Sequence, residues 1–251
     1  MIKKIYNKIV LRAIALILVL CATTRVSFGQ VVGDYGFVQT TATSGQYLAA
    51  TINNWVVCQS AGTWTGATTA TLAVGGSVNA FIRTGTTCAL SGSTSFKNLT
   101  IESTAAFIAA IGTTSGSPKG VRINGSTLFV DGTLGGTGNA GVDGYLSIEP
   151  QLINGTVKIK TTASGTVTIS RARPSASATT GITLKLNIDI TFITTGQVFS
   201  TNGASNTTIE IGAGKTITIP SGYVAISNNP TADLGTGANA FVVNIYGNLN
   251  L

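Results

Sequence analysis

The amino-acid sequence predicts an all-β protein, and more specifically a right-handed parallel β-helix with an N-terminal cap region. Three observations lead to this prediction: short runs that alternate apolar and polar residues, an abundance of Thr, Val and Ile, and Gly or Asn turns between the runs. Glycine contributes 31 of the 251 residues, and only 9% of the residues are charged. Strong helix formers such as Glu, Lys, Gln and Met are scarce, which favours half-buried strands over helices.

The first 29 residues have the pattern of a signal peptide. Residues 1–12 carry four positive charges, and residues 13–22 form an apolar stretch too short to span a bilayer comfortably. Ser27-Phe28-Gly29 then places small residues at the −3 and −1 positions. We therefore expect cleavage before Gln30 and secretion or display at the cell surface, with an uncleaved anchor helix as the alternative.

The formal charge of +7 belongs mainly to this leader. Five of the fifteen Lys and Arg residues precede Gln30, so the mature chain keeps ten basic residues against eight acidic ones. Binding to phosphate backbones depends on clustered Lys and Arg. The composition of the mature chain therefore argues against a nucleic-acid partner.

Residues 76–251 contain short apolar–polar–apolar runs, the signature of strands with one buried face. Such a unit, followed by a Gly or Asn turn, returns every ~10 or ~20 residues, which suits either a parallel β-helix or a β-sandwich of hairpins. Very short strands with inward Ile, Val and Leu favour the β-helix, because these side chains stack on copies of themselves in neighbouring coils. The runs are 78–83, 99–101, 128–130, 146–148, 157–159, 167–169, 182–190, 209–211, 217–219 and 243–245.

Residues 30–75 are less regular and are predicted to form the cap region. Tyr35, Trp55 and Trp64 are expected to cover the open end of the first coil, although aromatic rings of this kind also stack on sugars. The last residues, 241–251, stop inside a strand–turn–strand unit. We therefore expect the β-helix of residues 76–251 to continue in the remainder of a longer polypeptide.

Several short motifs resemble the N-terminal region of large exported surface proteins of the Bacteroidetes, many of which are type IX secretion substrates. They are Gly33-Asp34-Tyr35, the tryptophans Trp55 and Trp64, the phrase at 96–102 (FKNLTIE) and the closing run at 244–251 (NIYGNLNL). The sequence departs from that pattern at Gly36-Phe37, where Arg-Ser is usual, and it lacks the C-terminal sorting domain. The resemblance implies an adhesin-like protein at the cell surface and carries over no catalytic residues.

Two cysteines, Cys58 and Cys88, remain after removal of the leader. In an exported protein an even pair permits a disulfide, which would stabilise the fold by roughly 3–4 kcal/mol. The alternative is two separate thiols buried as small hydrophobic side chains. Two cysteines in a chain without histidine do not suffice for a typical structural zinc site.

Four basic residues, Lys158, Lys160, Arg171 and Arg173, occupy alternate positions of two consecutive strand-like runs. If those two strands lay side by side, the four side chains would form one stripe able to bind an acidic polysaccharide. The alternative is ordinary solubilising charge on a polar face.

Acidic residues supply two further hypotheses. Asp131 and Asp143 flank a glycine-rich segment and are candidate calcium ligands, with a plain loop as the alternative. Asp189 and Glu210 occupy outward strand positions one plausible coil apart and would lie side by side if those coils stacked, as carboxylate catalysis requires, with an ordinary solvated face as the alternative. A dinucleotide site at the G-x-G-x-x-G match of residues 136–141 is excluded because a strand follows it rather than a helix.

The sequence therefore predicts a non-catalytic extracellular β-solenoid that acts as an adhesin-like or stalk segment, with glycans as candidate ligands and no cofactor. The absence of histidine excludes Ser-His and Cys-His catalytic arrangements. Two alternatives remain open. One is a carbohydrate-active β-helix enzyme, a polysaccharide lyase or hydrolase, and the other is a passive spacer without a ligand.

Overall fold

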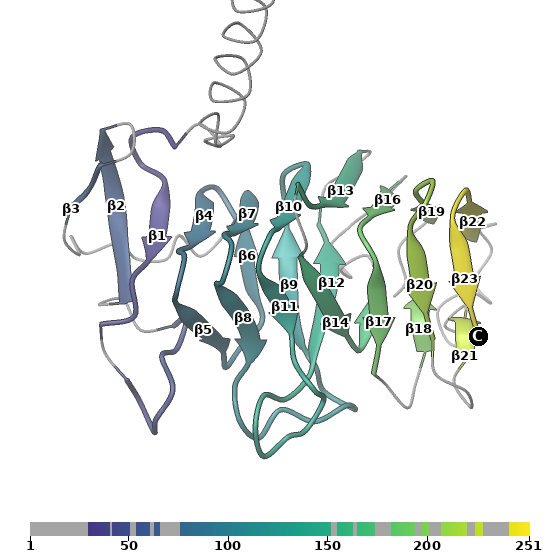
Figure 1. The fold of residues 1–251 in the computed structure, drawn as a ribbon, viewed down its shortest axis with the longest axis horizontal. Coiled ribbons are helices and arrows are strands. Elements are labelled where there is room, and N and C mark those ends of the chain that lie inside the picture. Colours follow the sequence, from purple (N-terminus) through teal and green to yellow (C-terminus); the bar gives the residue numbers. More distant parts are fainter. Residues whose placement is uncertain are drawn as a thin grey trace, which may run out of the picture.

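A computed structural model gives the fold of the chain (Figure 1). It describes residues 30–40, 42–50, 54–60, 63–65, 76–151, 155–162, 165–173, 182–193, 197–200, 207–219, 224–227 and 241–251. These residues form 23 β-strands in three sheets and no α-helix, so the prediction of an all-β chain is confirmed. A helix long and apolar enough to cross a bilayer does not occur among them. The predicted signal peptide lies outside the described residues.

The first sheet, which we call sheet 1, contains ten strands within the described ranges. Its strands pair in parallel from β1 to β22, whereas β1–β2 and β2–β3 pair antiparallel at one end. In spatial order these strands are β3 (Thr63–Thr65), β2 (Trp55–Ser60), β1 (Tyr35–Phe37), β4 (Asn79–Ile82), β7 (Asn98–Ile101), β10 (Thr127–Val130), β13 (Thr156–Lys160), β16 (Ile182–Asn187), β19 (Thr207–Ile211) and β22 (Phe241–Ile245).

Sheets 2 and 3 are parallel throughout the described residues. Sheet 2 consists of β5 (Thr87–Leu90), β8 (Ala106–Ala109), β11 (Thr133–Gly135), β14 (Thr166–Ile169), β17 (Ile190–Phe192), β20 (Thr216–Thr218) and β23 (Asn248–Asn250). Sheet 3 consists of β6 (Thr94–Phe96), β9 (Lys119–Ile123), β12 (Leu146–Pro150), β15 (Arg171–Ala172), β18 (Gln197–Ser200) and β21 (Val224–Ser227).

From β4 onward the chain visits the three sheets in a fixed order. Each set of three consecutive strands, which we call a repeat, places one strand in sheet 1, one in sheet 2 and one in sheet 3. Successive repeats follow one another along the long axis of the molecule (Figure 1). Antiparallel pairing between strands, which a β-sandwich requires, occurs in the described part of the chain only among β1, β2 and β3, and one isolated antiparallel bridge joins Thr43 and Gln46.

The core consists of apolar side chains that stack in register from one repeat to the next. In sheet 1, Leu99, Leu128, Ile159, Leu186 and Ile211 are successive partners, and all five are buried. The alternation of buried and half-buried residues along β16 and β19 follows directly from the apolar–polar sequence. Each such side chain contributes about 1.5–3 kcal/mol of hydrophobic stabilisation, and that contribution depends on the neighbouring repeats.

The two tryptophans of the N-terminal region lie on opposite faces of sheet 1. Trp55 is completely buried, stacks edge-to-face on Phe37 with centroids 5.1 Å apart, and donates its Nε1–H to the carbonyl of Ala49 at 2.8 Å. Trp64 lies on the outer face against Gly36, with the guanidinium of Arg83 4.8 Å from its ring centroid. One ring belongs to the core, and the other is half-buried against Gly36 and the Arg83 guanidinium, so neither is an open platform for a sugar.

A chain of side-chain hydrogen bonds joins the N-terminal segment to the first repeats. The buried carboxylate of Asp34 accepts hydrogen bonds from the backbone N–H of Val31 at 2.9 Å and from Asn79 Nδ2 at 3.0 Å. Asn79 Oδ1 in turn accepts from Asn98 Nδ2 at 2.9 Å, and Asn98 Oδ1 accepts the backbone N–H of Thr127 at 3.0 Å. These polar groups therefore stack in register just as the apolar ones do.

Candidate functional site

The outer face of sheet 2 carries two parallel rows of threonine. Thr168, Thr191 and Thr218 are partners on three adjacent strands, and Thr133 pairs with Thr166 in the second row. Asp189 follows Thr166 in the second row, and Thr216 lies beyond it, because Ile190 pairs with both Val167 and Ile217. Among the described residues of β14, β17 and β20, the side chains between these threonines are buried. We call the six residues the threonine face: Thr133, Thr166, Thr168, Thr191, Thr216 and Thr218.

The local sequence explains why these hydroxyls point outward in order. In β14 and β20 threonine alternates with Val167 and Ile217, which are buried, so the pleat directs every threonine to the opposite side. Neighbouring strands lie about 4.7–4.9 Å apart, and the hydroxyls therefore repeat at that spacing. Threonine is β-branched and stiff at χ1, so little rotamer freedom is lost when such a surface binds a partner.

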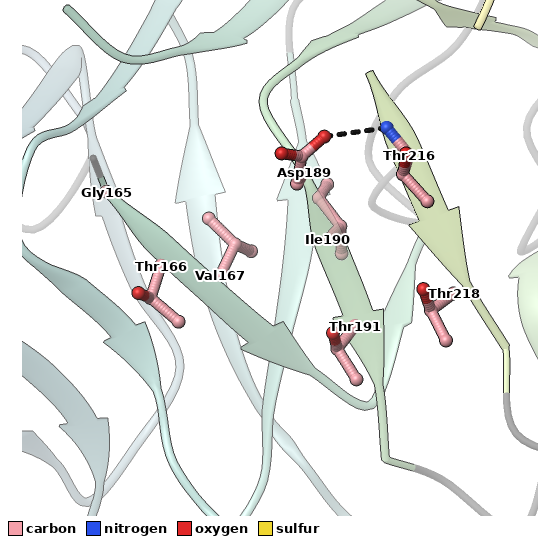
Figure 2. A pocket seen from close by; sticks show the side chains of 8 residues that line it. All are labelled: Gly165, Thr166, Val167, Asp189, Ile190, Thr191, Thr216 and Thr218. Carbon is pink, nitrogen blue, oxygen red and sulfur yellow. Dashed lines mark hydrogen bonds between the residues drawn. The ribbon is translucent and has the colours of Figure 1, made fainter. Parts of the chain in front are cut away.

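A shallow hollow of about 390 Å³ crosses three strands of this face (Figure 2). Its polar lining comes from Thr166, Thr191, Thr216, Thr218 and Asp189. The carboxylate of Asp189 accepts the backbone N–H of Thr216 at 2.7 Å, which joins the corner before β17 to the start of β20. The lining therefore offers several hydroxyl donors and acceptors and one carboxylate already engaged by the backbone. Such a surface is suited to hydrogen bonding with a neutral polyhydroxylated molecule.

The four basic residues highlighted by the sequence do not form one stripe. Lys158 and Lys160 lie on β13 in sheet 1, whereas Arg171 and Arg173 lie on or next to β15 in sheet 3. The expectation of a single stripe required β13 to pair with the strands that follow it, but β13 pairs with β10 and β16. The order of the three sheets explains the separation of the lysines from the arginines, because consecutive strands belong to different sheets.

The two lysines have different surroundings. Lys158 is exposed and lies beside Lys185 of β16, whose Nζ is 2.8 Å from Glu210 Oε1. The Nζ of Lys160 lies 5.8 Å from the centroid of the Phe129 ring.

The two carboxylates Asp189 and Glu210, considered for carboxylate catalysis, do not form a neighbouring pair. Glu210 pairs with Lys185 in sheet 1, whereas Asp189 lies at the edge of sheet 2.

The two candidate calcium ligands accept hydrogen bonds from two different loops. Asp131 accepts hydrogen bonds from Thr161 Oγ1 at 2.8 Å and from the backbone N–H of Thr162 at 2.8 Å in the following repeat. Asp143 accepts the backbone N–H and the hydroxyl of Thr137 at 2.6 and 3.0 Å within its own loop. The described residues contain no group of three or more His, Cys, Asp or Glu side chains placed to hold a metal ion.

The cysteines Cys58 and Cys88 are both buried thiols in the structure, on β2 of sheet 1 and β5 of sheet 2. Complete burial raises the pKa of the Cys88 thiol well above its usual value, because the thiolate would be desolvated. A thiol of this kind reacts slowly with electrophiles, since the thiolate is the reactive form.

We expect the folded chain of residues 30–251 to resist a thiol reagent such as DTNB, and the same chain after denaturation to release two thiols per molecule without reductant. The reason is that both side chains are fully buried in the fold and are not joined to each other. Titration of the thiols before and after addition of guanidinium chloride measures both numbers. No thiols in the denatured, unreduced chain would instead demonstrate the disulfide.

Sequence reasoning did not single out the six residues of the threonine face as a site, although a signal for them is present. The threonines of T-V-T at 166–168 and T-I-T at 216–218 mark outward positions. The sequence does not indicate which of these runs belong to the same sheet.

Comparison of the chain with protein-family models, with curated proteins and with solved structures finds no significant match.

Proposed function

We propose that this chain is a right-handed parallel β-helix that serves as an adhesive or stalk segment outside the cell and binds polysaccharide through its threonine face. In this proposal residues 1–29 are a signal peptide, residues 30–75 cap the first repeat, and residues 76–251 form the β-helix. The observation that carries the proposal is the fixed three-sheet order, which leaves an outward, ordered row of hydroxyls on sheet 2.

The N-terminal contacts support the cap. Trp55 and Phe37 pack over the start of the core, and Phe96 of the first repeat lies 6.4 Å from the Trp55 ring. A solenoid needs such a cover because its terminal repeat has an apolar face with no neighbouring repeat on one side. The Asp34–Asn79–Asn98 hydrogen-bond chain ties this cover to the next two repeats.

The extracellular location is supported by the sequence pattern of residues 1–29 and by the resemblance to exported Bacteroidetes surface proteins. The type IX route belongs to the same proposal. A rod-like adhesive segment also agrees with the composition, because a surface with few charges and many hydroxyls presents numerous weak hydrogen-bonding groups.

Polysaccharide is the ligand class that fits the threonine face best. The hollow extends from β14 to β20, two strand spacings or about 10 Å, the size of a short sugar segment. A single hydrogen bond contributes only about 0.5–1.5 kcal/mol, so one sugar unit would bind weakly. Repetition of the hydroxyls along the sheet converts weak contacts into useful avidity for a polymer. Asp189 is the single carboxylate among the residues that line the hollow, which favours binding over two-carboxylate hydrolysis.

The double substitution Thr191→Val and Thr218→Val tests this function. It removes two neighbouring hydroxyls and keeps the side-chain shape, so we expect about a tenfold or greater loss of affinity for neutral polysaccharides. Affinity gel electrophoresis of the mature chain, with neutral glucans and mannans in the gel, measures the effect. Retardation of the unsubstituted protein identifies the polymer to be used.

The matched control is Thr183→Val with Thr208→Val. These two threonines are also register partners, on β16 and β19 of the same two repeats, but they lie on the outer face of sheet 1. The control should bind like the unsubstituted chain. Equal weakening by both pairs, or no binding of any polymer by the unsubstituted chain, would reject the threonine face as the site and leave the passive spacer.

A further inference from the structure

A cluster of three arginines surrounds one carboxylate on the outer face of sheet 3. Arg122 of β9 pairs in register with Glu149 of β12. Arg173 follows β15 and donates its backbone N–H to Ile148, which places it beside Glu149 on the other side. Arg171, two residues earlier, pairs with Ser147. We call Arg122, Arg171 and Arg173 the arginine cluster.

Glu149 already has its partners within this cluster. Its carboxylate is almost fully buried and accepts hydrogen bonds from Arg122 Nε at 3.1 Å and from the Ser147 hydroxyl at 3.0 Å. Arg173 Nη2 approaches it at 3.7 Å. Gly120 provides the space, since a Cβ atom there would lie 2.6 Å from the Glu149 carboxyl carbon. One negative charge is therefore shared by two arginines.

Arg171 is left without a comparable partner. The Nε atoms of Arg171 and Arg173 are buried and have no hydrogen-bond acceptor among the described residues. Burial, followed by repulsion from Arg173, lowers the pKa of Arg171 to about 10, and the attraction of Glu149 only partly offsets both effects. A guanidinium that loses water without gaining an acceptor destabilises the fold. Three cations against one anion leave an excess of positive charge on this face.

We propose that the arginine cluster is a second binding site, which takes an oxyanion substituent, a carboxylate or a sulfate, of an acidic polysaccharide, with Arg171 as its principal ligand. The planar guanidinium fork matches such groups with two parallel hydrogen bonds. The bound anion adds an acceptor for the Arg171 guanidinium and neutralises the excess charge. The side chains of Arg122 and Arg173 are 37% and 23% exposed, so the cluster is within reach of a ligand in solution.

The lysines of sheet 1 fit this role less well. Lys185 is paired with Glu210, and Lys158 is exposed, where salt and water weaken its attraction for an anion. The inference rests on the proposed polysaccharide-binding function but uses a different face. Sheet 2 would contact neutral hydroxyls of the polymer, and sheet 3 its acidic groups.

The test compares Arg171→Gln with Lys158→Gln, which removes one positive charge from sheet 1 instead. Thermal unfolding of the mature chain is followed in sodium sulfate and in sodium chloride of equal ionic strength. We expect sulfate at ten times its dissociation constant to raise Tm by about 3–6 °C in the unsubstituted chain and in the lysine variant, and to lose this effect in Arg171→Gln. Without sulfate, Arg171→Gln should unfold at the same temperature or higher, because a half-buried guanidinium whose Nε has no acceptor among the described residues has been removed.

Affinity electrophoresis then separates the two sources of the oxyanion. Retardation by polygalacturonate identifies a carboxylate, retardation by dextran sulfate identifies a sulfate, and in either case Arg171→Gln should abolish it. If Arg171→Gln does not fold, Arg171→Lys takes its place in the test. This variant keeps the positive charge but loses the planar guanidinium fork, so we expect intermediate retardation. Equal sulfate effects in all variants, or none in the unsubstituted chain, would overturn the proposal. Binding of neutral glucans tests the threonine face alone. If these polymers do not bind, the effect of sulfate on Tm still tests the arginine cluster.

Discussion

Replacing Leu128 by alanine is expected to lower the free energy of unfolding by about 2–5 kcal/mol. Leu128 is completely buried in β10 and stacks between Leu99 of the preceding repeat and Ile159 of the following one. The cavity left by the substitution would have these two side chains as its walls, and the strands that carry them cannot close it without losing their own register. The midpoint of unfolding in guanidinium chloride, followed by far-UV circular dichroism of residues 30–251, measures the loss.

The control for this substitution is Val142→Ala, which also shortens an aliphatic side chain. Val142 is 57% exposed in a loop, so its substitution should change stability by no more than about 0.5 kcal/mol. If the two variants unfolded at the same denaturant concentration, Leu128 would not lie between two repeats and the in-register stack would be incorrect.

Replacing Gly135 by alanine is expected to cost about 3 kcal/mol or more. Gly135 ends β11 with a φ of 87°, a conformation that strains any L side chain. A Cβ atom there would also collide with the carbonyl oxygen of Thr168 and lie 2.7 Å from its carbonyl carbon. The substitution therefore pushes β14 away from β11 at Thr168, which belongs to the threonine face.

Gly92→Ala provides the matched control. Gly92 lies in a turn without a positive φ, and no heavy atom lies within 4 Å of the position of its Cβ. This variant should unfold at the temperature of the unsubstituted chain or slightly above it, because alanine reduces the freedom of the unfolded state. Thermal unfolding of the two variants at equal concentration measures the difference. A Gly135→Ala variant as stable as Gly92→Ala would mean that β11 and β14 are not neighbours.

Many of the strands and their inward-facing side chains could be predicted from the sequence, because apolar and polar residues alternate within each of these strands. Leu99-Thr-Ile101 and Val157-Lys-Ile159 alternate cleanly, and both lie in strands whose apolar residues are buried. The run 182–190 was expected as one strand. It divides instead into β16 and β17, with exposed Asp189 at the corner between them. Alternation alone does not mark a corner when the apolar–polar pattern continues through it.

Other strands escaped prediction because their alternation is weak. In β5 the residues Cys88, Ala89 and Leu90 are all buried, so the outward side chain at this position is small and apolar rather than polar. A strand of this kind cannot be distinguished from other apolar segments by periodicity. The sequence therefore did not indicate β5, β8 or β11, and the first strand of sheet 2 with a clear apolar–polar alternation is β14.

The neighbours of each strand were not predictable because the repeats differ in length. Asn79 and Asn98 are bonded across 19 residues, Asn98 and Thr127 across 29, and Lys185 and Glu210 across 25. Without a constant period, the spacing of Lys158 and Arg171 could be assigned to adjacent strands of one sheet. The structure instead places their strands in sheets 1 and 3. The alternation of apolar and polar residues indicates which side chains face inward. The sheet to which each strand belongs is known only from the structure.

The stacking of repeats in parallel sheets also determines how the molecule would respond to mechanical load. The strands run across the long axis, so the hydrogen bonds between repeats point along it (Figure 1). Tension applied at the two ends would load these bonds one row at a time, as in unzipping, rather than shearing many rows together. A chain built in this way would yield at modest force, release its length stepwise and absorb energy before it breaks.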